Sequence, residues 1–566
     1  MLFSWLIIAG LVARQSYGIA LPEFANPHLG AARLGAVASE SSICSQSGTK
    51  ILQKGGNAAD AMIATVLCVG TVGMHHSGIG GGGFALVHDK DGSFEFIDFR
   101  ETAPSAASQD MYDVNANLSI YGGLASGVPG QLRGLEHIHA KYGVLPWNSL
   151  VQPSIQLARY GFQVTQDLVA NMIKATTGTE DFLTLNPSWA IDFAPNGTRL
   201  GLGDTMTRRR YADLLEVIGK QGVDAFYTGP LAESMINAIQ SANGTMTLED
   251  LRNYTVAIRG PLQIDYRGWK ITSTSAPSSG PVTLSTLKIV EGYDHFFSPG
   301  MTNLSTHRMD EAMRFAYGQR TLLGDPSFVQ GVDEYQNRMI SDNTSREICS
   351  RISDFHTQDV SAYDPDNIDI INTPGTSHIV SADYSGMAVS LTTTINLAFG
   401  SHVIVPETGV IMNNEMNDFS IPNVDNAFGY VPQASNYIKP GKRPLSSITP
   451  TIVTHPNGTL YFVVGAAGGS RITTATIQSL IHAVDQDMPP HEALAQPRLH
   501  DQLIPNQVTF DWAYDNRTVN YMCSLGHNVT WVAPGQTQVQ ALRRLPNGTF
   551  EAAGEPRQAN SGGFAV

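Results

Sequence analysis

The stretch of sequence that decides the fold is PGTSHIVSADYSGMAVSLTTTIN, residues 374–396. It holds two runs rich in β-branched residues on either side of the turn-like segment 383–386, and this pattern predicts a β-hairpin. Folding the chain about that turn places Thr376 opposite Thr393 and Thr394. The sequence therefore predicts a strand that begins at a threonine and faces further hydroxyl groups across the ladder.

This threonine has a chemical interpretation. If the Gly375–Thr376 bond were cut, Thr376 would carry a hydroxyl nucleophile and a free amine on one residue. An α-amine titrates near pH ~7.7–8.0, which suits a general base, and a threonine paired with its own amine is an established activated nucleophile. Threonine also favours ordinary strands, so the interpretation depends on the rest of the chain.

Bulk properties restrict the class of protein. The 566 residues carry a net charge of −15 without a basic block, which argues against nucleic acid as a partner. The dense cationic run 208–210 is expected to be the solvated start of a helix. Mixed helix and strand patterns predict a layered α/β or α+β body. We expect helices at 58–69, 131–142, 153–159 and 307–322, and strands at 84–88, 447–465 and 507–511.

The N-terminus predicts entry into the secretory pathway. Residues 1–13 are almost wholly apolar but too short to span a bilayer. Small residues near Gly18 and Ala20 then favour a signal peptide over residues 1–20, with a short uncleaved anchor as the alternative. A secreted protein is expected, and vacuolar or cell-surface destinations stay open. Glycosylation sequons occur at Asn117, Asn196, Asn243, Asn253, Asn303, Asn343, Asn457, Asn516, Asn528 and Asn547.

The chain has four cysteines. Cys44 and Cys68 are the favoured disulfide pair, because Cys349 and Cys523 are isolated in sequence. An oxidising compartment permits disulfides without requiring them. Four buried free thiols remain the alternative.

Two motifs match patterns of ligand-binding sites, one for a dinucleotide and one for a metal, but we do not expect either ligand. The glycine run 78–83 matches GxGxxG, but it follows a helix and precedes a strand, the reverse of the dinucleotide-binding order. Close approach of the backbone to a neighbour or ligand is the better interpretation. The pair His75-His76 and the group around His137 lack metal-ligand spacing and are interpreted as surface residues. No metal or organic cofactor is expected.

Several short strings occur along the chain in a specific order and spacing. They are GGNAADA (55–61), HSGIGGG (76–82), FRETAP (99–104), VPG (128–130), QPSIQLA (152–158), TLEDL (247–251), RTLLGDP (320–326), TINL (394–397), NNEMNDFS (413–420), KRPLSS (442–447) and GAAGGS (465–470). With them the chain resembles the γ-glutamyltransferase (γ-glutamyltranspeptidase) family of N-terminal-nucleophile hydrolases, from about residue 35 almost to the C-terminus.

The resemblance implies an α+β fold, a four-layer αββα sandwich built from two subunits of one precursor. Self-cleavage between Gly375 and Thr376 would give a large subunit, residues 21–375, and a small catalytic subunit, residues 376–566, that form one intertwined heterodimer. Some members carry a disulfide at the positions of Cys44 and Cys68. The family's gating tyrosine has no clean match, and Phe428 and Tyr430 are the candidates.

The resemblance also implies a function: transfer of the glutamyl group of glutathione or another γ-glutamyl compound to water, or to an amino acid or dipeptide acceptor. The implied roles fall on Thr376 (nucleophile), Thr394 (its orientation), Gly468 and Gly469 (oxyanion hole), Arg100, Ser446 and Ser447 (α-carboxylate), and Asn396, Glu415 and Asp418 (α-ammonium).

Two other functions are open at this point. An acylase acting on another amide, such as a glutaryl group, would have no use for the ammonium-binding acids Glu415 and Asp418. A secreted non-catalytic relative would have no use for Thr376 and Thr394. The presence of all four residues disfavours both alternatives.

Overall fold

The computed structural model describes residues 33–363, 375–422 and 433–566. The expected signal peptide, residues 1–20, and the gating candidates Phe428 and Tyr430 lie outside the described residues. Among the helices that are described, none is both long and apolar enough to cross a membrane.

The first of two large sheets has seven strands and contains the predicted hairpin. Every neighbouring pair in it is antiparallel. Its order is β18 (Gly562–Ala565), β1 (Gly35–Ser39), β9 (Gly375–Asp383), β10 (Ala388–Asn396), β2 (Gly82–His88), β3 (Phe94–Asp98) and β6 (Ala257–Arg259).

The register of the hairpin confirms the sequence prediction. Thr394 pairs with Thr376 across β9 and β10, and a bulge beyond Thr394 then pairs Asn396 with Gly375. Every residue of both strands is buried. Burial therefore does not distinguish the two faces, and the register follows from the short turn that joins the strands.

The second large sheet has six strands, in the order β17 (Phe550–Ala553), β16 (Gln538–Arg544), β12 (Leu460–Ala467), β11 (Thr451–Thr454), β8 (Trp269–Ser273) and β7 (Leu262–Tyr266). Its strands β12 and β16 pack on the hairpin of the first sheet. At this interface a side chain at Gly465 would overlap the ring of His378, since an added Cβ would lie 2.3 Å from it. Glycine is thus required by the close approach of the two sheets.

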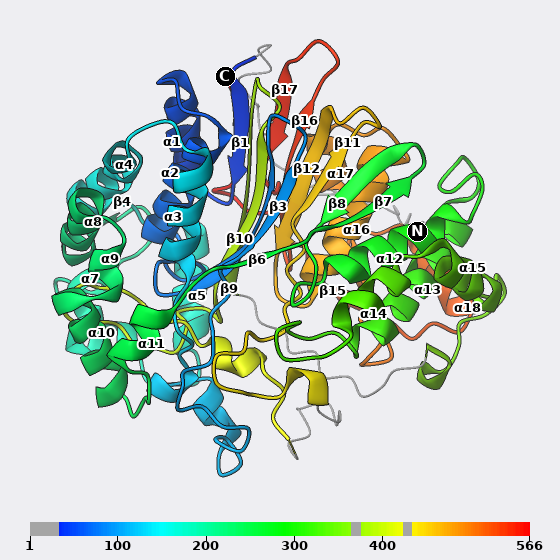
Figure 1. The fold of residues 1–566 in the computed structure, drawn as a ribbon. Helices are drawn as coiled ribbons and strands as arrows, with labels where there is room; N and C mark the ends of the chain where they lie inside the picture. The colour runs from blue at the N-terminus through cyan, green and yellow to red at the C-terminus, as the bar shows by residue number, and fades with distance from the viewer. Residues whose placement is uncertain (1–32, 364–374, 423–432) are drawn as a thin grey trace, which may run out of the picture. The chain divides into compact units, whose positions relative to one another are not determined.

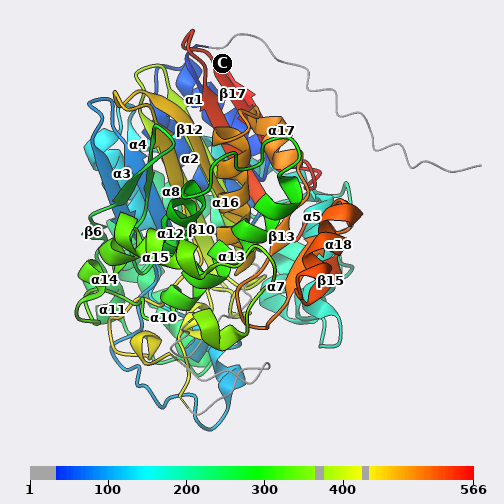
Figure 2. The same cartoon turned by 90° about the vertical axis from the view of Figure 1, so that its right-hand side faces the viewer.

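Helices cover the outer face of each sheet (Figure 1). On the first sheet lie α1 (Ser42–Gln53) and α2 (Ala58–Val72), and α2 is buried along its whole length because α4 (Trp147–Tyr160) packs behind it. On the second lie α12 (Gly280–Glu291) and α16 (Arg471–Val484), which Figure 2 shows from outside. The layers are helix, sheet, sheet, helix, as the αββα expectation required.

The remaining elements surround these layers. The other helices are α3 (Gln131–Tyr142), α5 (Gln166–Thr176), α6 (Phe182–Leu185), α7 (Pro187–Phe193), α8 (Arg209–Gln221), α9 (Asp224–Tyr227), α10 (Gly229–Ser241), α11 (Leu248–Asn253), α13 (Thr302–Arg320), α14 (Val332–Met339), α15 (Asp342–Arg351), α17 (Pro490–Ala495) and α18 (Asn516–Ser524). Two small sheets contain β4 (Phe162–Gln163) with β5 (Thr205–Met206), and β13 (Leu499–His500) with β14 (Val508–Asp511) and β15 (Val529–Val532).

Three sequence expectations were wrong in detail. The helix expected from residue 153 begins at Trp147, with Pro153 inside it. The strand expected over 447–465 is two strands, β11 and β12. Arg208 is buried rather than solvated, because its guanidinium donates to the carbonyl oxygens of Gly70, Thr71 and Gly409. The several fixed donors of arginine allow it to satisfy backbone acceptors in an interior.

Cys44 and Cys68 form a disulfide that joins α1 to α2. Cys349 is partly buried and Cys523 is exposed. The alternative of four buried free thiols is therefore wrong.

Candidate active site

Thr376 and Thr394 form a short hydroxyl network with the peptide group that precedes Thr376. Their Oγ1 atoms lie 3.2 Å apart. The hydroxyl of Thr394 donates to the carbonyl oxygen of Gly375 at 2.8 Å and accepts from the backbone N–H of Asn396 at 2.8 Å. Because the proton of Thr394 is directed to Gly375, its oxygen is left to accept from the hydroxyl of Thr376.

The bulge at the end of β10 creates this arrangement. Asn396 has a left-handed backbone, φ 73°, which turns its N–H back toward Thr394. Its side-chain Nδ2 donates to the carbonyl oxygen of Asn414 at 2.9 Å. The end of the hairpin is thus tied to the segment that carries Glu415 and Asp418. A left-handed asparagine is uncommon, and such conformations concentrate at functional sites.

Arg100 lies just after β3 and is 1% exposed. Its guanidinium forms ion pairs with both Glu415 and Asp418, and its Nε donates to the carbonyl oxygen of Pro444 at 3.4 Å. The sequence interpretation placed Arg100 at one end of a zwitterion and the two acids at the other. The structure brings all three into direct contact.

Glu101 is a further buried acid of this cluster that the sequence interpretation missed. Burial raises its pKa to about 7, against the opposing effect of the Arg100 charge. Burial also raises the pKa of Glu415 well above its usual range, with Glu101 and Asp418 adding to the rise. Two carboxylates therefore pair directly with one guanidinium, and the charge of that guanidinium also acts on a third carboxyl group, Glu101. Glu101 could have been found from its position in the sequence, because it directly follows Arg100 in the FRETAP string.

Ser446 and Ser447 lie in an irregular segment next to the helix α16, where Ser446 is buried and Ser447 is partly buried. The Oγ of Ser446 accepts from the N–H of Ile448 at 3.2 Å. The carbonyl oxygen of Ser447 accepts from the hydroxyl of Thr473 at 3.0 Å, which fixes the segment to the start of α16. The position of Pro444, which is bonded to Arg100, places this segment on the Arg100 side of the site.

Gly468 and Gly469 connect β12 to α16 and have φ of 126° and 63°. Along β12, the carbonyl oxygen of Val464 accepts from Ser390, and the next residue packs on His378. Since Ser390 pairs with Val380, β12 proceeds toward the Thr376 end of β9. The Gly468-Gly469 segment, which follows β12, therefore lies toward the Thr376 end of β9.

The fold is that of an N-terminal-nucleophile hydrolase: two stacked sheets between helical layers, here with a threonine hydroxyl at the start of a central strand. The chain belongs to the gamma-glutamyltranspeptidase family, whose model matches residues 44–564. It is accordingly an enzyme.

Relatives and solved structures agree with this assignment. The chain is 57% identical to the glutathione hydrolase proenzyme of Arthroderma benhamiae, over 94% of this chain and 93% of the relative. It is 53% identical to a glutathione hydrolase of Aspergillus flavus, over 94% and 90%. A cephalosporin acylase from Bacillus halodurans has a TM-score of 0.84 at 26% identity, over 98% and 99% of the two chains. Helicobacter pylori gamma-glutamyltranspeptidase has a TM-score of 0.53 at 33% identity, over 56% and 92%.

Proposed function

We propose that this protein is a glutathione hydrolase and γ-glutamyltransferase that cleaves itself before Thr376. The observation that carries the proposal is the contact of the Thr376 hydroxyl with Thr394, whose own hydroxyl is bonded to the carbonyl of Gly375. The names of the two fungal relatives support glutathione as the substrate.

Self-cleavage begins with attack of the Thr376 oxygen on the carbonyl carbon of Gly375. Negative charge develops on the Gly375 oxygen, where the hydroxyl of Thr394 already donates a hydrogen bond. The C–N bond then breaks, the amine of Thr376 takes a proton, and an ester joins Gly375 to the threonine oxygen. Water hydrolyses that ester and leaves a large subunit ending at Gly375 and a small subunit beginning at Thr376.

In the mature enzyme the free amine of Thr376 accepts the proton of its own hydroxyl. The oxygen attacks the γ-carbonyl of the substrate, while N–H groups of the Gly468-Gly469 turn stabilise the oxyanion. One donor of this kind is worth about 3–4 kcal/mol of barrier. The amine returns the proton to the leaving amine, and the γ-glutamyl ester is then released to water or to an acceptor amino acid or dipeptide.

The charged cluster explains recognition of the glutamyl group. The substrate α-carboxylate would take a share of the Arg100 guanidinium, with Ser446 and Ser447 donating to it. The α-ammonium would face Glu415 and Asp418, together with the side-chain oxygen of Asn396. Since buried acids outnumber the one guanidinium, an added ammonium compensates their charge. A glutaryl group lacks that ammonium, so the cluster favours a γ-glutamyl substrate.

We propose secretion as the destination, through cleavage of residues 1–20. The ten sequon asparagines support glycosylation, because all are exposed except Asn303, which is partly buried. Treatment of the purified protein with an endoglycosidase should lower its mass on a denaturing gel. An unchanged mass would contradict glycosylation.

The first prediction concerns processing itself. N-terminal sequencing of the wild-type protein should find two chains, one beginning Thr376-Ser377-His378. The Thr376→Ala variant should remain one uncut chain without activity on a γ-glutamyl anilide, because the hydroxyl nucleophile is removed and, without cleavage, the nitrogen of residue 376 stays in an amide bond. A cleaved, active Ala variant would refute the mechanism. A cleaved wild type that hydrolyses a glutaryl anilide but no γ-glutamyl anilide would refute the substrate alone.

A further inference from the structure

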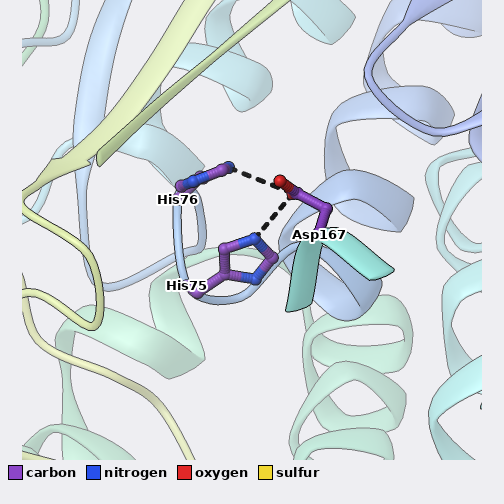
Figure 3. A group of neighbouring side chains, drawn as sticks. All are labelled: His75, His76 and Asp167. Carbon is purple, nitrogen blue, oxygen red and sulfur yellow. Dashed lines mark hydrogen bonds and ion pairs between the residues drawn. The ribbon is translucent and has the colours of Figure 1, made fainter. Parts of the chain in front are cut away.

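A second polar cluster is formed by residues other than those of the Arg100 cluster. His75 and His76 occupy the turn between α2 and β2, and Asp167 projects toward both from α5 (Figure 3). Both histidines are buried, so their interpretation as surface residues was wrong. The adjacent histidines were the local signal of this cluster, and Asp167 could not be assigned to it from sequence because it lies 92 residues further along the chain.

The polar atoms of this cluster converge on a small volume. His75 Nε2 lies 3.0 Å and His76 Nδ1 lies 3.9 Å from the same oxygen, Oδ2 of Asp167. A fourth group, the buried carboxylate of Glu40, places its Oε2 3.4 Å from His76 Nδ1. Two ligands of one tetrahedral zinc ion are about 3.4 Å apart, given metal–ligand bonds of about 2.0–2.2 Å. The separations of 3.0 and 3.9 Å between the histidines and Asp167 bracket that value, and the ligand atoms of these three residues all lie within 4.8 Å of one another, a group that does not include Glu40.

We propose that His75, His76 and Asp167 form a site for one divalent transition-metal ion of the zinc type, with the buried carboxylate of Glu40 beside His76. Two imidazole nitrogens and one carboxylate oxygen are a donor set that suits such an ion. Glu40 has a second buried oxygen, Oε1, with no hydrogen-bond partner among the described residues. An incompletely paired buried carboxylate is costly, and a cation compensates it.

The ion has a path to this site. Asp167 has 25% of its side chain exposed and lines a cavity of about 210 Å³, whereas both histidines and Glu40 are enclosed. Arg557 and Gln558 of the C-terminal segment line the same cavity, and Nε2 of Gln558 donates to Oδ2 of Asp167 at 3.5 Å. An ion can therefore reach Asp167 first and then be taken by the buried ligands.

A comparable group, His307, Glu311 and His527, lacks such a path. All three are fully buried, and none lines a described cavity. His527 already contacts His307 and Asp310, while Glu311 accepts from the hydroxyl of Tyr363. That group is a closed hydrogen-bond network, so we assign no metal to it.

The metal site is joined to the end of β10. The carbonyl oxygen of His75 accepts from the N–H of Phe399 at 3.0 Å, and that of His76 accepts from Ile395 at 3.3 Å. Ile395 directly follows Thr394. A bound ion would hold the histidine turn and, through these hydrogen bonds, the segment that positions Thr394. The expected role is therefore structural support of the hairpin, without contact with substrate.

The test uses the full-length protein without a polyhistidine tag, stripped with a chelator and then titrated with zinc chloride. Calorimetry and elemental analysis should find one zinc ion per chain, and zinc should raise the melting temperature, because an ion that binds only the folded state stabilises it. Asp167→Asn, which keeps the size of the side chain, should weaken zinc binding at least about tenfold. Thr376→Ala should bind zinc normally, which separates this site from the proposed catalysis.

His455→Gln is the matched control, because this histidine contacts aromatic rings and no acid. It should bind zinc like the wild type. Cobalt bound to the wild-type protein should give the visible absorption of a tetrahedral ion, and zinc should displace it. This measurement uses the wild-type protein alone, so it does not depend on whether a variant folds. No zinc binding by the wild type, or equal binding by Asp167→Asn and wild type, would overturn the proposal and leave the cluster as hydrogen-bonded ion pairs.

Discussion

At the scale of single residues, Arg100 is already occupied before any substrate arrives, since its guanidinium is shared by Glu415 and Asp418. A lysine keeps a positive charge there but cannot form two parallel hydrogen bonds with a carboxylate. A hydrogen bond to a charged group is worth about 1.5–3 kcal/mol. We therefore expect Arg100→Lys to raise KM for a γ-glutamyl anilide roughly 10- to 100-fold, with a smaller change in kcat.

Arg314→Lys is the control for that variant. Arg314 is an equally buried guanidinium, paired with Asp501 away from the site. The Arg314→Lys variant should lower thermal stability and leave KM for the γ-glutamyl anilide unchanged. An unchanged KM in Arg100→Lys would contradict the carboxylate-binding role.

Glu101 gives the site a pH dependence. Its pKa is raised from 4.5 to about 7 by burial. A raised folded-state pKa means that its contribution to stability is present below pH 4.5 and is lost as the pH rises through about 7. Substrate binding has the opposite sign, because the ionised carboxylate attracts the α-ammonium. KM should therefore fall as the pH rises through about 7.

Kinetics over a pH series will test this dependence. In Glu101→Gln the fall in KM should disappear or move to lower pH, because loss of this neighbour lowers the pKa of Glu415. Asp485→Asn is the control: burial raises the pKa of Asp485 to about 6, but this residue is bonded to Tyr266 outside the site. It should leave the KM profile unchanged. The same profile in Glu101→Gln as in the wild type would contradict the role of Glu101.

At the scale of elements, local patterns were predictable and long-range contacts were not. The register that pairs Thr376 with Thr394 follows from the position of the short turn that joins the two strands. The ion pairs of Arg100 cross more than three hundred residues, and no local periodicity encodes them. The resemblance placed these residues in one site, whereas their direct pairing and the burial of Glu101 required coordinates.

The glycine run 78–83 was expected to bring backbone close to a neighbour, and that neighbour is the end of β10. A Cβ on Gly81 would lie 2.0 Å from the carbonyl oxygen of Thr394. Gly81→Ala should therefore displace Thr394, slow self-cleavage and lower stability by roughly 1–3 kcal/mol. Gly260→Ala is the control, because nothing lies within 4 Å of a Cβ there.

Both glycine variants can be followed by the fraction of cleaved chain on a denaturing gel and by chemical denaturation. Gly260→Ala should match the wild type in both. Normal cleavage of Gly81→Ala with normal stability would show that β10 can yield to the added methyl group, and would contradict the tight packing.

At the scale of the whole molecule, each large sheet contains strands from both sides of the Gly375–Thr376 bond. In the first sheet β18, β9 and β10 follow the bond and β1, β2, β3 and β6 precede it. In the second, β11, β12, β16 and β17 follow it and β7 and β8 precede it. This strand order was not evident from residue patterns, because pairing such as β1 with β9 closes a loop of more than three hundred residues.

The cleaved protein should therefore stay together as one heterodimer. Separation would break the pairs β18–β1, β1–β9, β10–β2 and β11–β8, and would expose strands that are buried in the core. Size-exclusion chromatography of the processed enzyme should give a single peak containing both chains, which separate only under denaturing conditions. Residues 376–566 expressed alone should be insoluble or unfolded, since edge strands without partners aggregate. A small subunit that elutes alone and folded under native conditions would contradict the shared sheets.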